Sequence, residues 1–190
     1  MTKVAIMCAD GCEEVEALTP VDVFRRLGIQ ADMVGLSSTT VTGAHDIKLT
    51  ADKVLDDSLM GYDAVIFPGG MGGAQHLRDC KSLKKLMVKR QQDGKWNCAM
   101  CAAPTAFAHY GLLNDADYTV YPGMEEDVAK EAKNSRFHED ITVVDEKHHL
   151  VTSRGPATAM AYAFQIAAVL GIDTNDLQHA MLYDFLKENI

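Results

Sequence analysis

The sequence predicts an α/β protein in which a mostly parallel central sheet is covered by helices on both faces. Short apolar runs of strand length alternate with segments of helical periodicity along the 190 residues. The runs are apolar throughout rather than at every second residue, which is typical of parallel strands buried on both sides. We expect a single domain over residues 1–190, because no linker, repeat or low-complexity tract interrupts the pattern.

The individual elements follow from these patterns. Strands are predicted over residues 3–8, 30–36, 63–67 and 96–100, with hairpins over residues 40–50 and 141–153. Helices are predicted over residues 13–27, 104–110, 156–170 and 173–187, and a further helix around Leu83 and Met87 ends at Gly94. Pro20 lies inside the first helix, so we expect a kink there or a restart with Thr19 as N-cap.

Composition limits the kind of partner. A net charge of −9 with 47% hydrophobic residues indicates a globular protein with a real core and gives no sign of a nucleic-acid partner. The short apolar run after Lys3 is followed at once by acidic residues, unlike a signal peptide, and no run approaches the length of a membrane span. We therefore expect a cytoplasmic protein. Its five cysteines, an odd number, argue against a disulfide framework.

Cys98 and Cys101 have the C-x-x-C spacing of redox and zinc sites, but the predicted strand over residues 96–100 argues against both. Three residues of strand span about 10 Å, and positions an odd number apart point to opposite faces. A disulfide needs Cα atoms within about 7 Å. No second C-x-x-C or histidine cluster completes a zinc site. We expect Cys98 to be a core residue, and we predict neither a metal nor a cofactor.

Cys101 is the candidate reactive residue. It follows a buried strand and precedes the helix that begins with Pro104, so it lies on a sharp turn. Free amides at the start of a helix favour an anion, and thiolates at such positions have lowered pKa values. The arrangement is that of a nucleophile elbow with cysteine in place of serine. Most cysteines are structural; the elbow is what favours a reactive thiol here.

Two further segments are predicted to meet Cys101 where the parallel strands end. The glycines after Pro68 can turn backbone amides toward a ligand and, with the amide of Ala102, form an oxyanion hole. They do not form a P-loop, since no Gly-Lys-Ser/Thr follows. Glu16 can turn inward toward the thiol, where burial would raise the pKa of its carboxyl. Cys12, on the same loop, can reach the mouth of the pocket.

Four motifs together resemble the ThiJ/PfpI superfamily, and most closely its DJ-1 branch. They keep the order of that family and spread over nearly the whole chain: Gly11-Cys12-Glu13-Glu14-Val15-Glu16, Pro68-Gly69-Gly70-x-x-Gly73-Ala74, Cys101-Ala102-Ala103-Pro104-Thr105 and Thr152-Ser153-Arg154-Gly155-Pro156. The resemblance implies a flavodoxin-like three-layer sandwich that forms a homodimer and acts without a cofactor.

The resemblance also implies roles for single residues. Cys101 matches the nucleophilic, peroxide-sensitive cysteine, and Glu16 matches the carboxyl that hydrogen-bonds to it. Gly70 and Ala102 match the oxyanion-hole amides. Around them, the resemblance implies a pocket that includes Gly69, Tyr121 and Arg154.

Three positions depart from patterns within the superfamily. Ala102 stands where the protease branch has a histidine, which argues against a protease. Tyr121 stands where the closest branch often has a histidine, and a tyrosine is a poor base near neutral pH. His45 stands where some members have an arginine.

Two functions fit these residues. The first is a redox-sensitive, stress-protective protein in which Cys101 oxidises to a sulfinate; members of the branch are also described as chaperones. The alternative is an enzyme of methylglyoxal-type α-oxoaldehydes, described as glyoxalase III or protein deglycase, with Cys101 as nucleophile and Glu16 moving protons. The corresponding small molecules are peroxide and small aldehydes. Both functions use one pocket, so the sequence alone does not decide whether the protein is an enzyme.

Overall fold

The computed structural model describes residues 2–190 and confirms the mostly parallel sheet. Seven strands lie in the order β10-β11-β7-β6-β1-β2-β5, and only the β10–β11 pair is antiparallel. Their bounds are β1 (Lys3–Cys8), β2 (Gln30–Gly35), β5 (Lys53–Val54), β6 (Ala64–Phe67), β7 (Trp96–Met100), β10 (Thr142–Asp145) and β11 (Leu150–Ser153). Two small sheets join β3 (Thr40–Thr42) to β4 (Lys48–Thr50) and β8 (Asp117–Tyr118) to β9 (Arg136–Phe137).

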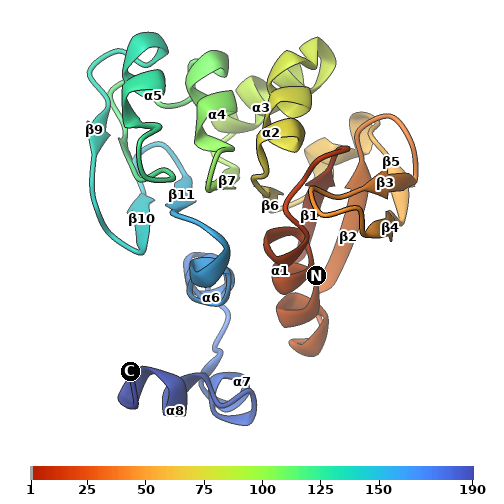
Figure 1. Cartoon of the computed structure of the whole chain (residues 1–190), viewed down its shortest axis with the longest axis vertical. Coiled ribbons are helices and arrows are strands. Elements are labelled where there is room, and N and C mark those ends of the chain that lie inside the picture. Colours follow the sequence, from red (N-terminus) through yellow and green to blue (C-terminus); the bar gives the residue numbers. More distant parts are fainter. Residues whose placement is uncertain (1) are drawn as a thin grey trace.

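Helices cover both faces of the large sheet, giving the three layers that the sequence predicts (Figure 1). One layer contains α2 (Met71–Asp79), α3 (Lys81–Gln92), α4 (Pro104–Tyr110) and α5 (Glu125–Glu131). The other contains α1 (Glu14–Arg26) and α6 (Ala159–Val169), which pack against each other, and the C-terminal helices α7 (Asn175–Ala180) and α8 (Tyr183–Glu188) lie beyond α6. Short 3-10 helices are η1 (Asp57–Gly61) and η2 (Pro156–Thr158).

The apolar strands bury both of their faces, as expected for a parallel sheet. In β1, Ala5 and Met7 belong to the core under α2–α4, whereas Val4 and Ile6 belong to the core under α1 and α6. Each side chain is fully buried. Because successive residues of a strand point to opposite faces, one short run supplies both cores.

The order of the strands creates a crevice at the ends of β1, β6 and β7. After β1 the chain adds β2 on one side, and it later returns to place β6 on the other side of β1. Loops that follow neighbouring strands diverge at such a switch point, which leaves room for a ligand at the carboxyl ends. The three segments predicted to meet there do leave the sheet at this edge.

Several details differ from the sequence prediction, among them the short strands β5, β8 and β9, which were not predicted. Helix α1 runs through Pro20 without a restart; burial of Ala17, Val21 and Phe24 outweighs the missing hydrogen bond. The last predicted helix is two helices, because Leu182 takes a left-handed φ of 58°. Helix α2 was not predicted, since its glycines favour a loop. Helix α5 was not predicted either.

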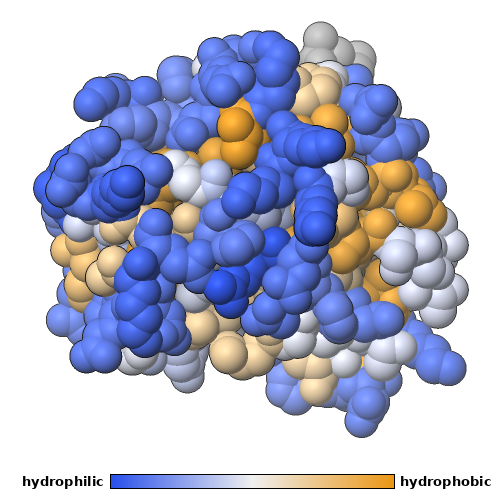
Figure 2. Space-filling model, turned by 90° about the horizontal axis from the view of Figure 1, so that it is seen from above, coloured by the Kyte–Doolittle hydropathy of each residue, from blue (hydrophilic) through white to orange (hydrophobic). Residues whose placement is uncertain are grey.

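The outer surface of the α2–α5 layer is an ordinary solvent-facing surface. Figure 2 views this layer from above, and hydrophilic residues predominate there, with smaller hydrophobic areas between them. Among the described residues 2–190, none of the helices has the length and apolar character needed to cross a bilayer.

Candidate active site

Cys101 lies at the tip of the predicted elbow. Its backbone takes a φ of 57°, a left-handed conformation that non-glycine residues rarely adopt and that is typical of functional turns. The residue is 9% exposed. The backbone amides of Gly70 and Ala102, the two predicted oxyanion donors, act to lower the pKa of its thiol. The strand–turn–helix geometry therefore presents one thiol to two converging amides.

Glycines are required where the segment after β6 approaches Cys101. A Cβ atom on Gly69 would lie 2.6 Å from the Cβ of Cys101 and 2.9 Å from the amide nitrogen of Ala102. Gly70 has a φ of 79°, and a Cβ there would lie 2.3 Å from the carbonyl oxygen of Gly11. Any side chain at either position would push the two segments apart, which explains the consecutive glycines.

Glu16 places a buried carboxyl beside the thiol. Its Oε2 accepts a hydrogen bond from the Gly69 amide at 2.7 Å, and its buried Oε1 has no hydrogen-bond partner among the described residues. The side chain is fully buried. Burial raises the pKa of Glu16 to about 7, although the Gly69 amide and the neighbouring Cys101 act to lower it. The carboxyl therefore exchanges its proton near neutral pH.

The pKa of Cys101 moves opposite to the direction expected at a helix start. Burial and the negative charge of Glu16 raise it to about 12, against the amides of Gly70 and Ala102, which lower it. When Glu16 takes up a proton, its repulsion of the thiolate disappears and its O–H can donate to the sulfur. A proton on Glu16 therefore lowers the pKa of the Cys101 thiol and favours its thiolate.

An open pocket of about 600 Å³ lies in front of Cys101. Gly70, Ala102 and Tyr121 line it, as expected, together with Glu13 and His45. Pro156 of the fourth motif also lines it, as do Met71 and Met124, which no motif singled out.

Arg154 is not part of this lining. Its guanidinium lies 3.6 Å from the carboxylate of Glu139 and stacks 5.8 Å from the ring centre of Phe137. This position differs from the pocket role that the family resemblance implies.

His45 closes one side of the pocket through Glu14. Its ring Nδ1 lies 2.8 Å from Glu14 Oε2, and its backbone amide donates to Oε1 at 2.8 Å. Glu14 is 4% exposed, and its carboxylate anchors the β3–β4 loop through these two contacts. Within residues 2–190, Glu13, Glu14 and His45 form the one group whose donor atoms are close enough to share a metal ion, and their ion pairs already account for it.

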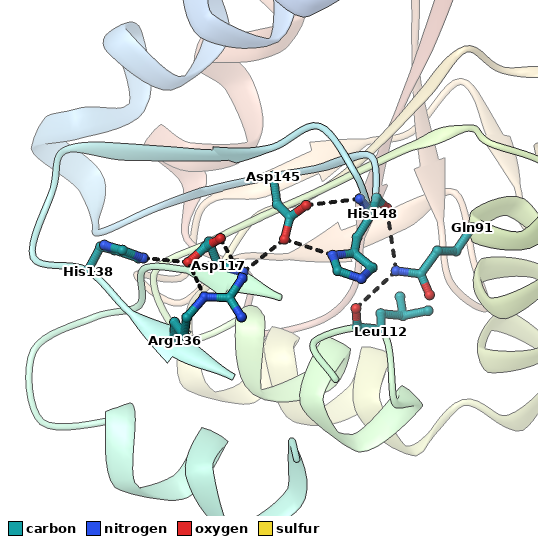
Figure 3. Close-up of polar contacts among 7 residues, drawn as sticks. All are labelled: Gln91, Leu112, Asp117, Arg136, His138, Asp145 and His148. Carbon is teal, nitrogen blue, oxygen red and sulfur yellow. Dashed lines mark hydrogen bonds and ion pairs between the residues drawn. The ribbon is translucent and has the colours of Figure 1, made fainter. Parts of the chain in front are cut away.

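The other histidines contact residues away from Cys101. In Figure 3 the ring of His138 contacts the carboxylate of Asp117, which also accepts a hydrogen bond from the guanidinium of Arg136. The ring of His148 contacts the carboxylate of Asp145. The Asp117 amide donates to Asp145 at 2.9 Å, so these contacts join β8–β9 to the β10–β11 hairpin. This network gives His138 and His148 structural roles, and His45 is the one histidine among the described residues that line the pocket in front of Cys101.

Cys12 does not reach the pocket, contrary to the expectation. Its side chain is fully buried, and the thiol of Cys8 is the largest influence on its pKa. Its backbone packs tightly against Gly73, where a Cβ would lie 2.6 Å from the Cα of Cys12. Cys98 is fully buried in the core, as predicted.

The fold and this site define a flavodoxin-like α/β protein with a cysteine elbow, an acidic neighbour and two amide donors. The sequence profile of the DJ-1/PfpI family matches residues 2–169. DJ-1beta of Drosophila melanogaster is 34% identical over 87% of both chains. Its crystal structure superposes with a TM-score of 0.87 at 30% identity, covering 96% of this chain and 98% of the other. The chain belongs to the DJ-1/PfpI family.

Two other relatives add detail. Protein DJ-1 homolog B of Arabidopsis thaliana is 36% identical over 88% of this chain, which spans only 38% of the length of that protein. A Caenorhabditis elegans relative named glutathione-independent glyoxalase DJR-1.2 is 29% identical over 85% of this chain and 84% of its own. Both matches agree with the assignment of the chain to this family.

Proposed function

We propose that this protein is a redox-sensitive, stress-protective member of the DJ-1 branch, with Cys101 as its peroxide-reactive residue. The observation that carries the proposal is the position of Cys101 on a left-handed elbow, where the glycine segment, the Ala102 amide and the buried carboxyl of Glu16 meet around it. This set of donors suits an oxidised, negatively charged sulfur better than a neutral thiol.

The chemistry follows from these contacts. The Cys101 thiolate attacks one peroxide oxygen, the O–O bond breaks, and the departing hydroxide takes up a proton to form water. A second peroxide converts the sulfenate to the sulfinate in the same way. The amides and the protonated Glu16 donate to the new oxygens, and the nearly complete burial of the sulfur limits further oxidation.

The proposal includes a homodimer in the cytoplasm. Val15 is 50% exposed and Leu18 is 40% exposed on α1, which also carries Glu16. Two apolar side chains on an exposed helix face suit a self-complementary interface.

Tyr121 is 45% exposed at the pocket and offers a hydroxyl donor rather than a base.

Survival of cells under peroxide tests this function. Cells that lack their own DJ-1 family protein would express wild type, Cys101→Ser or, as the matched control, Cys80→Ser, which changes a half-buried cysteine outside this pocket. We expect wild type and Cys80→Ser to protect equally and Cys101→Ser to give no protection. Equal protection by Cys101→Ser would contradict the proposal.

The glyoxalase alternative needs its own assay. Conversion of methylglyoxal to lactate without glutathione would be measured on the same purified variants and on Glu16→Gln. We expect negligible turnover by wild type. Rapid turnover that depends on both Cys101 and Glu16 would favour the enzyme and displace the sensor function.

A further inference from the structure

The pocket in front of Cys101 is much larger than hydrogen peroxide requires. Its volume is about 600 Å³, and sites for small organic ligands typically measure about 300 to about 1,000 Å³. A water molecule occupies about 30 Å³ in the liquid, and hydrogen peroxide is little larger. The pocket therefore has room for an organic group attached to the peroxide oxygen that Cys101 attacks.

Apolar side chains line this pocket next to the reacting sulfur. Met71 directly follows Gly70 at the start of α2, and it is 70% exposed. The amide of Tyr121 donates to the carbonyl of Cys101 at 3.0 Å, and the amide of Met124 donates to the carbonyl of Tyr121 at 3.1 Å. These two hydrogen bonds fix the turn that carries Tyr121 and Met124 beside the elbow.

Packing holds two of these side chains in place. A Cβ atom on Gly155 would lie 3.4 Å from the ring of Tyr121, so the ring lies against the backbone of this glycine. Met124 is half-buried and packs against both cores. Apolar surface that is fixed and exposed around a nucleophile favours a ligand with an apolar group, because such a group covers it.

The opposite wall carries more negative than positive charge. Glu13 and His45 line it. The Nδ1 atom of His45 lies 2.8 Å from the carboxylate of Glu14 and 3.7 Å from that of Glu13, so one imidazole faces two carboxylates. Among residues 2–190, no lysine or arginine lines the pocket. An anionic organic group would be repelled here, whereas an uncharged one would not.

We propose that Cys101 reacts preferentially with organic hydroperoxides whose organic group is apolar and uncharged, and that Met71, Tyr121 and Met124 contact this group. The inference rests on the proposed peroxide chemistry of Cys101. The thiolate attacks the terminal oxygen of R–O–O–H, so that an S–O bond forms and the O–O bond breaks. The sulfur is oxidised to the sulfenic acid, and the departing alkoxide takes up a proton from water to become the alcohol R–OH.

The rates of Cys101 with cumene hydroperoxide, whose organic group is aromatic and uncharged, and with hydrogen peroxide test the preference. Each rate constant is measured as the loss of iodoacetamide alkylation on the Cys101 peptide with time, by mass spectrometry. The ratio of the two constants is compared with the same ratio for N-acetylcysteine, which accounts for the intrinsic reactivity of each peroxide. We expect the ratio at Cys101 to be higher by about tenfold, because the pocket buries the aromatic group.

Two matched variants test the role of the apolar wall. Met71→Gln should bring the ratio closer to that of N-acetylcysteine, and because the side chain is largely exposed its replacement leaves the core intact. Leu186→Gln changes an apolar side chain of α8 that is 50% exposed and lies outside this pocket. This control should keep the wild-type ratio.

A ratio at Cys101 no higher than that of N-acetylcysteine would overturn the inference, and so would a wild-type ratio in Met71→Gln. If Cys101 is oxidised readily by hydrogen peroxide without this preference, the inference fails and the proposed function stands. If neither peroxide oxidises Cys101 ahead of the other cysteines, the proposed function fails as well.

Discussion

Replacing Glu16 with glutamine should abolish a pH-dependent loss of stability. The carboxyl is fully buried, and its pKa rises from 4.5 to about 7 on folding, chiefly through burial. The folded state therefore binds this proton more tightly than the unfolded chain, so wild-type stability falls as the pH rises from the unfolded pKa through the folded one. At about 1.4 kcal/mol per pKa unit the loss amounts to about 3 kcal/mol.

Glutamine keeps the oxygen that accepts the Gly69 amide and carries no charge. As the pH rises from about 4.5 to about 8.5, the free energy of unfolding of Glu16→Gln should therefore increase by about 3 kcal/mol relative to that of wild type. Urea unfolding, followed by the fluorescence of the single tryptophan, Trp96, measures the difference at each pH. If the difference in free energy of unfolding between the two proteins stays constant across this pH range, the interpretation of Glu16 as a buried acid is refuted.

Glu14→Gln is the matched control on the same helix. Burial acts to raise the pKa of Glu14, but the hydrogen bonds from His45 prevail and lower it. The charged form is thus the stabilising one, and that stability is present above the unfolded pKa and lost as the pH falls through the folded pKa. Glu14→Gln should be less stable than wild type near neutral pH, and this deficit should shrink toward acid pH.

Three further outcomes are expected from the structure. Gly73→Ala should lower the free energy of unfolding, measured in urea, by at least about 2 kcal/mol, because the new Cβ would lie 2.6 Å from the Cα of Cys12. Gly72→Ala should lower it less, because the nearest contact of its new Cβ is 3.3 Å away. Equal effects would contradict the steric argument. Arg90→Met should lower the melting temperature and reduce the free energy of unfolding by about 3 kcal/mol, since the buried guanidinium donates to the carbonyls of Leu59, Tyr62 and Trp96. An unchanged melting curve would show that these bonds contribute nothing. Light scattering at micromolar concentration should give twice the chain mass of 20.8 kDa, and Leu18→Glu should shift it toward the monomer; a monomeric wild type would contradict the proposed dimer.

The strongly patterned elements could be predicted from the sequence, because their signals are local. The run at residues 3–8 is β1 to the residue, and the helix expected at Pro104–Tyr110 is α4 with the same bounds. Apolar strands and an N-terminal proline determine such elements without help from distant contacts. The elbow at Cys101 followed from α4 and from the strand before it, β7, whose bounds were also predicted to the residue.

Tertiary contacts decided the rest. Cys12 and Arg154 could be placed on the correct loops, but the direction of each side chain depends on neighbours that the sequence does not reveal. Cys12 is fully buried in the core under α1 and α6, and Glu139 and Phe137 hold Arg154 away from the pocket. The pKa of Cys101 was misjudged for the same reason, since burial and the charge of Glu16 outweigh the amides.

The central claim is that Glu16 and two amides make Cys101 the most peroxide-reactive cysteine. A peroxide titration with peptide-resolved mass spectrometry, on wild type and Glu16→Leu, tests this claim most directly. We predict that sulfinate forms on Cys101 at doses that leave Cys8, Cys80 and Cys98 unmodified, and that Glu16→Leu loses this sulfinate or oxidises it further. Sulfinate appearing first on another of these cysteines, or an unchanged titration of Cys101 in Glu16→Leu, would contradict the account.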